Sequence, residues 1–285
     1  MNNAIKLIEC PRDAMQGLHN FIPTATKAAY INTLLKVGFD TIDFGSFVSP
    51  KAIPQLRDTA EVLGLLDLSN TKSKLLAIIA NTRGAENACK FEEINYLGFP
   101  FSISENFQQR NTNSSIEESI IRVEEIQNLC LKHNKKLVIY ISMAFGNPYG
   151  DAWNGDIAVS YTEKLYEKGI RIFAMSDTIG SSNRENITDL FSKTIPAFAD
   201  AEIGAHLHST PETRTEKIAA AYEAGCRRFD AAINGIGGCP MAKEELTGNL
   251  ATESLIDYFD SLNIEIGLNK EAMQNAFLQA KMVFP

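Results

Sequence analysis

The sequence lacks any run of apolar residues long enough to cross a lipid bilayer, which takes about 20 consecutive residues in a helix. Its first residues, 1–4, carry neither the basic segment nor the apolar segment of a secretory signal, and they run directly into a strand-like stretch. These absences argue against a membrane-spanning or exported protein. The cytosol is therefore the expected location.

Paired cysteines and an excess of positive charge are missing as well. The five cysteines are odd in number and widely spaced, without a Cys-x-x-Cys pair, so neither a disulfide framework nor a structural zinc site is expected. The formal net charge is -8, and an acidic protein is a poor partner for nucleic acid. This balance fits a soluble enzyme, in which a phosphate-rich ligand would have to be bound by a local cationic patch.

What the sequence does contain is a regular alternation of short β-branched segments with helical segments. Apolar residues recur at three- and four-residue spacing between the strand-like runs, as in 116–133 and 215–225. Such alternation implies parallel strands joined by right-handed crossovers. One (β/α)8 TIM barrel accounts for all 285 residues as a single domain, and an open doubly wound sheet is the alternative. The expected strands are 5–10, 41–44, 74–79, 93–97, 136–141, 171–176, 202–208 and 227–233.

Several expected helices end in residues that tolerate a left-handed backbone. Gly38, Gly169 and Gly225 each stand directly before a strand, and Asn134 follows the cationic last turn of the helix over 116–133. The last stretch, 250–285, has the pattern of two further helices that close the fold.

Polar residues gather where the expected strands end. In a TIM barrel the carboxyl ends of the strands and the loops after them carry the chemistry. We therefore expect these side chains to meet at one end of the barrel. They are Glu9, Arg12 and Asp13 after the first strand, Asp43 at the second, Asp177 at the sixth, His206 and His208 at the seventh, and Cys239 and Asn249 after the eighth.

Two of the four histidines form a His-x-His pair at the end of the seventh expected strand. Residues two apart on a strand face the same side, so the imidazoles of His206 and His208 would both point toward the barrel mouth. Two neutral imidazoles in this arrangement can bind one metal ion. A pair of hydrogen-bonded histidines without a metal is the alternative interpretation.

Two oxygen donors, Asp13 and Asn249, would complete a metal site from other loops. Nitrogen and oxygen donors without a thiolate favour octahedral Mg²⁺ or Mn²⁺ over a structural zinc. Each donor is ambiguous when taken alone, because an Arg-Asp dipeptide is commonly a surface ion pair and a Gly-Asn dipeptide is commonly a turn.

The segment 235–240 is rich in glycine and contains Cys239. A thiol between glycines and a proline is expected on a mobile, partly exposed loop, whereas Cys10, Cys89 and Cys226 fit buried positions better. A phosphate-binding loop is a weaker interpretation, since the segment lacks the Lys-Ser/Thr pair of such loops.

Five segments resemble the motifs of 3-hydroxy-3-methylglutaryl-CoA lyases, and they run in order through nearly the whole chain. The resemblance implies a TIM-barrel metallolyase that splits hydroxymethylglutaryl-CoA into acetyl-CoA and acetoacetate. An acyl-CoA would then be the substrate, nucleic acid and membrane are not expected as partners, and a homodimer is left open. The segments are Pro11-Arg12-Asp13-Ala14-Met15-Gln16, Ser46-Phe47-Val48-Ser49-Pro50-Lys51, Ser176-Asp177-Thr178-Ile179-Gly180, Gly237-Gly238-Cys239-Pro240 and Gly248-Asn249-Leu250-Ala251-Thr252-Glu253.

The resemblance also implies a role for individual residues. Arg12 would stabilise an oxyanion, Cys239 would be the acid/base of a loop, and Asp13 would lie beside the substrate hydroxyl and take its proton. Glu9, Gln16, Asp43 and Asp177 are expected to contact the substrate or to support the other site residues, with Asp43 and Asp177 holding Arg12 and the ligands. The implied ligands of a divalent metal, Mg²⁺ or Mn²⁺, are Asp13, His206, His208 and Asn249.

The sequence departs from the family pattern at several positions. Asp43 stands where the family has a glutamate, and Ser209 replaces the aspartate after the second histidine. Ala14 and Met15 replace a Gly-Leu pair. These changes keep every implied ligand, and they bear on which substituent at C3 of the substrate is accepted.

Two other functions are compatible with part of this pattern. A condensing acyltransferase of the isopropylmalate or homocitrate synthase type would share the Arg-Asp and His-x-His elements. Those enzymes usually carry additional C-terminal subdomains, whereas this sequence ends at residue 285 and has Cys239 in a lyase-type loop. A barrel that binds metal without catalysing a reaction is the second alternative.

Overall fold

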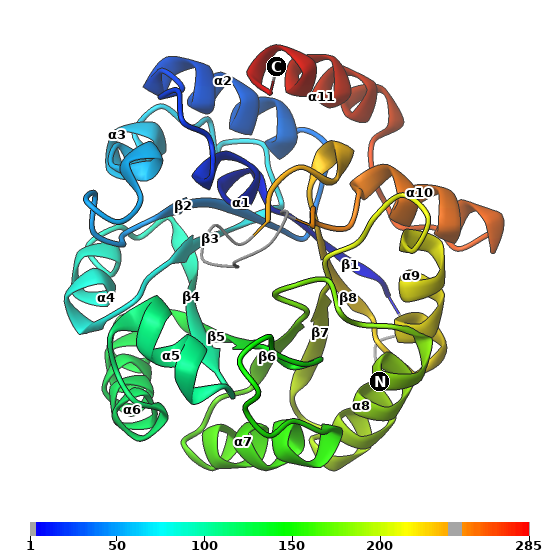
Figure 1. Cartoon of the computed structure of the whole chain (residues 1–285). Coiled ribbons are helices and arrows are strands. Elements are labelled where there is room, and N and C mark those ends of the chain that lie inside the picture. Colours follow the sequence, from blue (N-terminus) through cyan, green and yellow to red (C-terminus); the bar gives the residue numbers. More distant parts are fainter. Residues whose placement is uncertain (1–3, 239–246, 285) are drawn as a thin grey trace.

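The computed structural model describes residues 4–238 and 247–284. Eight parallel strands form a closed barrel in sequence order, and β8 pairs with β1 (Figure 1). The predicted TIM barrel is therefore confirmed, because an open sheet would leave these two strands unpaired. The strands are β1 (Lys6–Glu9), β2 (Thr41–Ser46), β3 (Lys74–Ile78), β4 (Ile94–Ser102), β5 (Lys136–Ser142), β6 (Ile172–Ser176), β7 (Glu202–His206) and β8 (Arg228–Ala231).

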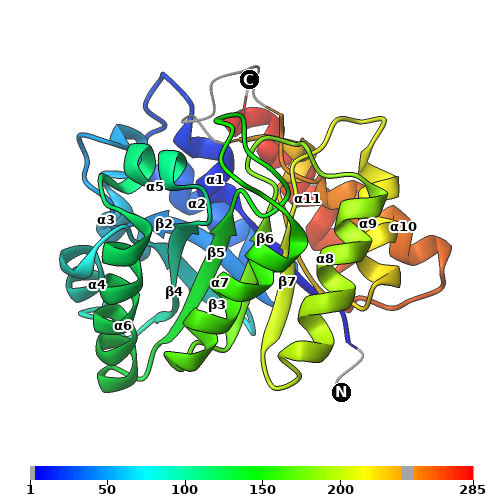
Figure 2. The same cartoon turned by 60° about the horizontal axis from the view of Figure 1, so that its bottom comes forward.

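Helices surround the barrel, as Figures 1 and 2 show. The two predicted C-terminal helices are present, and α11 packs against α2. No helix of the described residues is long and apolar enough to span a membrane. The α-helices are α1 (Pro11–Gln16), α2 (Thr24–Leu35), α3 (Thr59–Leu63), α4 (Thr82–Ala88), α5 (Glu105–Thr112), α6 (Ile116–Lys132), α7 (Gly155–Glu167), α8 (Arg184–Ala197), α9 (Arg214–Glu223), α10 (Thr252–Ser261) and α11 (Lys270–Val283), and short 3-10 turns cover Pro54–Leu56 and Ile233–Gly235.

The residues expected to end helices adopt the predicted conformations. Gly38, Gly169 and Gly225 have φ angles of 91°, 87° and 102°, and Asn134 has a φ of 55°. These left-handed residues turn the chain from each helix into the next strand.

β2 and β5 extend one or two residues beyond the sequence pattern, and β4 extends five. The prediction ended at residue 97, but β4 continues to Ser102 and pairs with β5 from Tyr96 to Ser102. Gly98 and Pro100 interrupt the apolar pattern, since glycine offers no side chain and proline no N–H. Pairing along the neighbouring strand maintains the extended backbone in spite of both residues.

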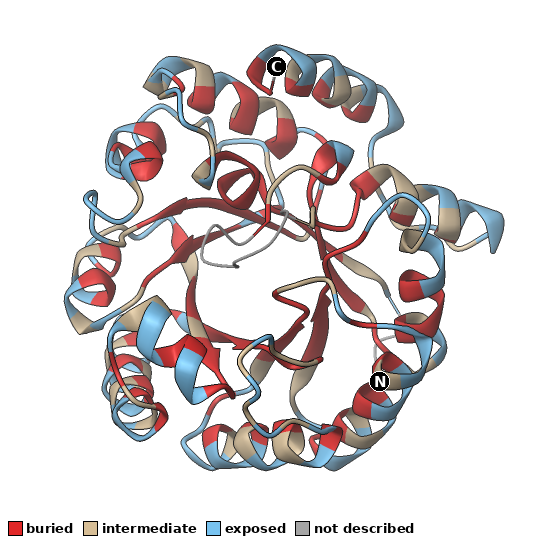
Figure 3. Cartoon of the chain, viewed as in Figure 1, coloured by how far each residue is buried: buried red, intermediate tan, exposed pale blue. Residues whose placement is uncertain are grey.

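The two sides of the strands bury different kinds of residue. On β8, Phe229 and Ala231 belong to the apolar core between the barrel and its helices, while Arg228 and Asp230 alternate with them and face the barrel interior. Figure 3 shows buried residues along the strands and on the inner faces of the helices. The barrel interior is thus partly charged, and this charge lies directly beneath the site described next.

Candidate active site

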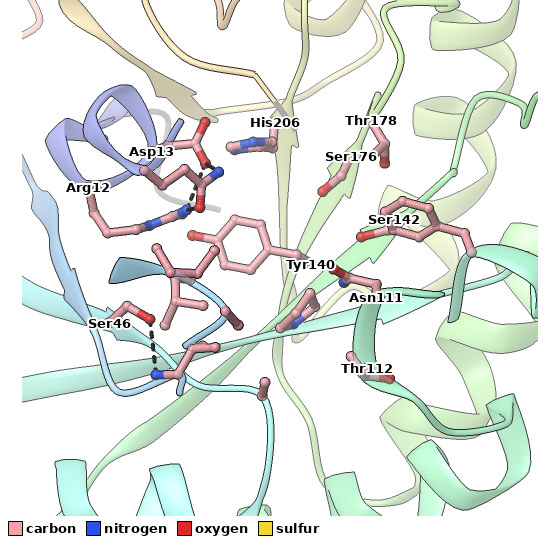
Figure 4. Close-up of a pocket in the computed structure, with 18 of the residues that line it drawn as sticks. Arg12, Asp13, Ser46, Asn111, Thr112, Tyr140, Ser142, Ser176, Thr178 and His206 are labelled. Carbon is pink, nitrogen blue, oxygen red and sulfur yellow. Dashed lines mark hydrogen bonds and ion pairs between the residues drawn. The ribbon is translucent and has the colours of Figure 1, made fainter. Parts of the chain in front are cut away.

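A pocket opens at the carboxyl ends of the strands, where the sequence predicted the chemistry. Its volume is about 340 Å³. The last residues of several strands line it, so the barrel itself fixes their positions. Figure 4 shows side chains from opposite sides of the barrel converging on the same space. The lining includes the strand-terminal residues Ser46, Ile78, Ser142, Ser176 and His206, together with Arg12, Asp13, Gln16, Tyr140 and His208.

Asp13, His206 and His208 form a compact group of potential metal ligands. One ligand atom of each residue lies within 4.8 Å of the others, and all three residues are buried. His206 uses Nδ1 in a contact with Asp230, which leaves Nε2 for another partner. Neither ring nitrogen of His208 has a hydrogen-bond partner among the described residues. A buried polar atom without a partner calls for an explanation, and a bound metal ion is one that fits an imidazole nitrogen.

Asn249 lies beside this group. Its amide nitrogen donates to Asp13 Oδ2 at 2.7 Å and to the Ile236 carbonyl at 2.9 Å, so the amide oxygen remains available as a ligand. Gly237, with a φ of 111°, makes this approach feasible, because a Cβ there would lie 2.5 Å from Asn249 Nδ2. A side chain at position 237 would displace Asn249 from the site.

The ionisation of these groups suits a divalent cation. Burial, followed by the neighbouring His206, lowers the pKa of His208 to about 4, so its imidazole is neutral near neutral pH. Burial opposes the ionisation of Asp13, but Arg12 and the two imidazoles outweigh it and hold the pKa of Asp13 below its ordinary value. Burial opposes the protonation of His206, but Asp230 and then Asp13 outweigh it and raise the pKa of its imidazole, so metal binding there has to displace a proton. A carboxylate, neutral imidazoles and an amide oxygen are the forms that metal binding needs. The donor set therefore fits the divalent ion expected from the sequence.

Arg12 is fixed in the pocket by acidic and amide groups. Its Nε and Nη2 donate to Asp43 at 3.0 and 2.5 Å, and its Nη1 donates to Asp13 at 2.7 Å and to Gln16 at 2.9 Å. These bonds use four of the five N–H groups of the guanidinium and leave one on Nη2. Burial raises the pKa of Asp43 to about 6, against the opposing effect of Arg12. The structure thus places Asp43 and Gln16 as the residues that orient Arg12.

Two of the residues singled out in the sequence support the site from outside the pocket. Glu9 accepts the Ile233 N–H at 2.9 Å and the Thr252 hydroxyl at 2.5 Å, which ties β1 to the segment after β8. The backbone N–H of Asp177 donates to the His206 carbonyl at 2.9 Å, but its carboxylate contacts neither Arg12 nor the side chain of a proposed ligand. It accepts from Lys217 at 2.9 Å, and Lys217 also donates to the His208 carbonyl at 2.7 Å. Asp177 therefore acts on the position of His208 through this buried lysine.

The sequence prediction missed two residues that contact His206. Asp230 on β8 is fully buried and lies 3.2 Å from His206 Nδ1. Tyr140 on β5 packs against the His206 ring in a T-shaped contact, with 5.4 Å between the centroids, and its buried hydroxyl has no partner among the described residues. Figure 4 shows this hydroxyl directed toward Arg12. The available signal for Asp230 was a charged residue inside the otherwise apolar run 229–233.

The cysteines that were predicted to be buried are buried in the structure. Cys10, Cys89 and Cys226 are buried, and so is Cys130. Cys239 lies outside the described residues, so its predicted place at the pocket stays a prediction.

Glu9 should make the stability of the protein depend on pH. Burial raises the pKa of its carboxyl to about 8, whereas an unfolded glutamate titrates near 4.3. Between pH about 4.3 and about 8 the folded state holds a proton that the unfolded state has lost. The contribution of Glu9 to the free energy of unfolding is therefore fully present below pH about 4.3 and is lost as the pH rises toward about 8. One proton corresponds to about 1.4 kcal/mol per pH unit. Glu9→Gln should reduce the slope of the free energy of unfolding against pH by about this amount.

Urea unfolding of the metal-free protein between pH about 5 and about 8 measures this slope. The control is Glu61→Gln at an exposed position of α3, which should keep the slope of the unsubstituted protein. An identical slope in Glu9→Gln would mean that Glu9 is ionised in the folded state.

Comparisons with known proteins identify the family of the chain. The HMGL-like family model matches residues 5–277. The hydroxymethylglutaryl-CoA lyase of Bacillus subtilis is 31% identical over 277 residues, which cover 96% of this chain and 92% of that protein. The mitochondrial hydroxymethylglutaryl-CoA lyase of Homo sapiens is 32% identical over 95% of this chain and 83% of that protein. The solved structure of an HMG-CoA lyase from Acinetobacter baumannii, in complex with coenzyme A and 3-methylmalate, has a TM-score of 0.91 and 29% identity and covers 99% of this chain and 91% of that chain. The chain therefore belongs to the HMGL-like family.

Proposed function

We propose that the chain is a carbon–carbon lyase that cleaves 3-hydroxy-3-methylglutaryl-CoA, or a close 3-hydroxyacyl-CoA, to acetyl-CoA and a 3-oxo acid. Residues 1–285 would act as one domain with a divalent metal, Mg²⁺ or Mn²⁺. The observation that carries the proposal is the buried group of Asp13, His206 and His208 beside the fixed guanidinium of Arg12. Asn249 would be the fourth protein ligand.

The relatives support cleavage rather than condensation. Those reported above are named as lyases, and the ligands in the solved complex are coenzyme A and a hydroxy acid. These ligands match the two halves of a 3-hydroxyacyl-CoA substrate. A condensing acyltransferase has no comparable support.

Cleavage begins at the C3 hydroxyl of the substrate. A bound divalent ion would supply Lewis-acid chemistry that lowers the pKa of this hydroxyl. Asp13 accepts the hydroxyl proton, and its second oxygen stays oriented by Asn249. The bond between C2 and C3 then breaks. Its electron pair moves to C2 and the thioester, and C3 becomes the ketone carbon of the departing 3-oxo acid.

Arg12 stabilises the negative charge that develops on the thioester oxygen. The remaining N–H on Nη2 can donate to this oxygen, while Asp43, Asp13 and Gln16 keep the guanidinium from moving. Donors that are fixed in advance need no reorganisation as charge appears, which makes them effective in a buried site. Val48, Ile53 and Ile78 add an apolar wall that limits the entry of water.

The enolate carbon finally needs a proton. We assign this step to the Cys239 thiol, on the family resemblance alone, since the residue lies outside the described part of the chain. A thiol with an ordinary pKa near 8.5 is a suitable acid near neutral pH. Protonation of C2 completes acetyl-CoA, and the thiolate regains a proton from the pool to which Asp13 releases its own.

A panel of 3-hydroxyacyl-CoA thioesters tests the proposal. With Mn²⁺ present, the purified protein should cleave 3-hydroxy-3-methylglutaryl-CoA or a thioester that differs from it at C3. Tight Mn²⁺ binding without cleavage of any thioester would instead indicate a binding protein. Condensation of acetyl-CoA with a 2-oxo acid would indicate an acyltransferase.

A further inference from the structure

A row of alternating charges runs through the barrel interior beneath the pocket. Lys6 on β1 pairs with Glu202 on β7, and Glu202 Oε1 lies 3.1 Å from Arg228 Nε in a second ion pair. Arg228 Nη1 lies 2.9 Å from Asp230 Oδ1, and Asp230 Oδ2 lies 3.2 Å from His206 Nδ1. The row therefore ends on a proposed metal ligand. The sequence motifs and the proposed chemistry account for none of the residues beneath that ligand.

Asp230 is enclosed between two partners on opposite sides. Its side chain is 0% exposed, and each carboxylate oxygen faces a different group. Room for Arg228 is provided by Gly204 on β7, because a Cβ there would lie 2.9 Å from the Arg228 side chain. The neighbouring strand is thus shaped to admit a buried guanidinium at this place.

An alternative explanation for Asp230 beside His206 is a second metal site below the pocket. The Cys10 sulfur also lies within 4.8 Å of ligand atoms of His206 and Asp230. This thiol contacts the Ile8 carbonyl at 3.8 Å, and burial raises its pKa well above the ordinary value. A metal would need the thiolate, so the three residues are better explained as support for the site above them.

We propose that Asp230 and Arg228 are positioning residues that hold the His206 ring with its proton on Nδ1 and with Nε2 directed at the metal. This inference rests on the proposed metal site. Metal-binding histidines commonly donate their other ring N–H to a carboxylate, which fixes both tautomer and orientation. Arg228 adds a second constraint here. Its Nη1 forms an ion pair with Asp230 Oδ1 at 2.9 Å, without hydrogen-bond geometry, and a guanidinium, which can only donate, disfavours a second donor at this place.

This second constraint predicts the effect of Asp230→Asn. The amide of asparagine would turn its oxygen to Arg228, since a buried N–H facing another donor is costly. Its NH2 group would then face His206 Nδ1, which can accept only in the tautomer that carries its proton on Nε2. That tautomer cannot offer Nε2 to a metal. Replacing Arg228 as well would free the amide to turn round and accept from Nδ1.

Calorimetric titration of the metal-stripped protein with Mn²⁺ tests the prediction. Asp230→Asn should weaken Mn²⁺ binding roughly 10- to 100-fold. The double variant Asp230→Asn/Arg228→Met removes one charge of each sign and should recover most of that loss. Glu202→Gln changes the same row without touching Asp230, so its Mn²⁺ affinity should stay within about twofold of the unsubstituted protein.

Equal affinity in Asp230→Asn and the unsubstituted protein would overturn the inference, and so would a double variant no tighter than the single one. An unsubstituted protein that binds no Mn²⁺ would refute the proposed metal site itself, which is a distinguishable result. If Asp230→Asn does not fold, nitrogen-15 spectra of the unsubstituted protein with Mg²⁺ decide the question. The chain has four histidines, and His206 must carry its proton on Nδ1; a proton on Nε2 contradicts the inference.

Discussion

Replacing His208 by alanine is expected to abolish metal binding and nearly all turnover. The ring is buried, and neither nitrogen has another partner among the described residues, so its position serves the proposed metal. Loss of a ligand removes the Lewis acid, which contributes several kcal/mol to such reactions and corresponds to roughly a thousandfold or more in kcat. Elemental analysis of the purified variant and its kcat with saturating Mn²⁺ measure the two effects.

His133→Ala is the matched control, since this histidine is exposed at the end of α6 and precedes the amino end of β5, whereas the pocket lies at the carboxyl ends of the strands. It should keep both metal and turnover. A His208→Ala protein with full metal content and normal kcat would show that the site does not use this imidazole. The same result for His206→Ala would remove the basis of the His-x-His assignment.

Arg12→Lys should lower kcat by about 100- to 1,000-fold, with a much smaller change in KM. Lysine keeps the charge but cannot donate to Asp43, Asp13 and the substrate oxygen from one planar group. Because Arg12 acts on charge that forms only during cleavage, the loss should appear in kcat. Steady-state kinetics with 3-hydroxy-3-methylglutaryl-CoA separate the two constants.

The control for this variant is Arg184→Lys, whose residue forms surface ion pairs with Glu216 and Glu223. Its kinetics should match the unsubstituted protein. The unfolding temperature of Arg12→Lys should be measured together with the kinetics, because the substitution removes part of the buried ion pair with Asp43 and can destabilise the fold. A folded Arg12→Lys protein with unchanged kcat would mean that Arg12 serves only to hold Asp43 and Asp13.

The fold was predictable because each local signal agreed with the closed barrel. Strand and helix periods alternated along the chain, and Gly38, Gly169 and Gly225 marked the turns into strands. β4 was the exception, since Gly98 and Pro100 suppress the strand pattern although pairing with β5 continues past them. Local sequence cannot report a conformation that a neighbouring strand imposes.

The site was predictable only where residues carry a motif. His206 and His208 stand out because residues two apart on an extended backbone face the same side. The predicted strand 202–208 was too long, since β7 ends at His206 and His208 lies just beyond it in an isolated bridge with Asn249. Asp230 and Lys217 were missed because their roles depend on partners distant in the sequence, His206 for one and Asp177 with His208 for the other. A charged residue within a buried strand or helix face is the one signal they leave. Such residues merit attention, since buried charges are rarely left unpaired.

The proposed reaction is the cleavage of a 3-hydroxyacyl-CoA with the help of a divalent metal held by Asp13, His206, His208 and Asn249. The most direct test is product analysis with metal-stripped protein and 3-hydroxy-3-methylglutaryl-CoA, before and after addition of Mn²⁺. We expect acetyl-CoA and acetoacetate to form in equal amounts, and only when the ion is present. Cleavage at an undiminished rate without any divalent ion, or intact substrate in its presence, would contradict the claim.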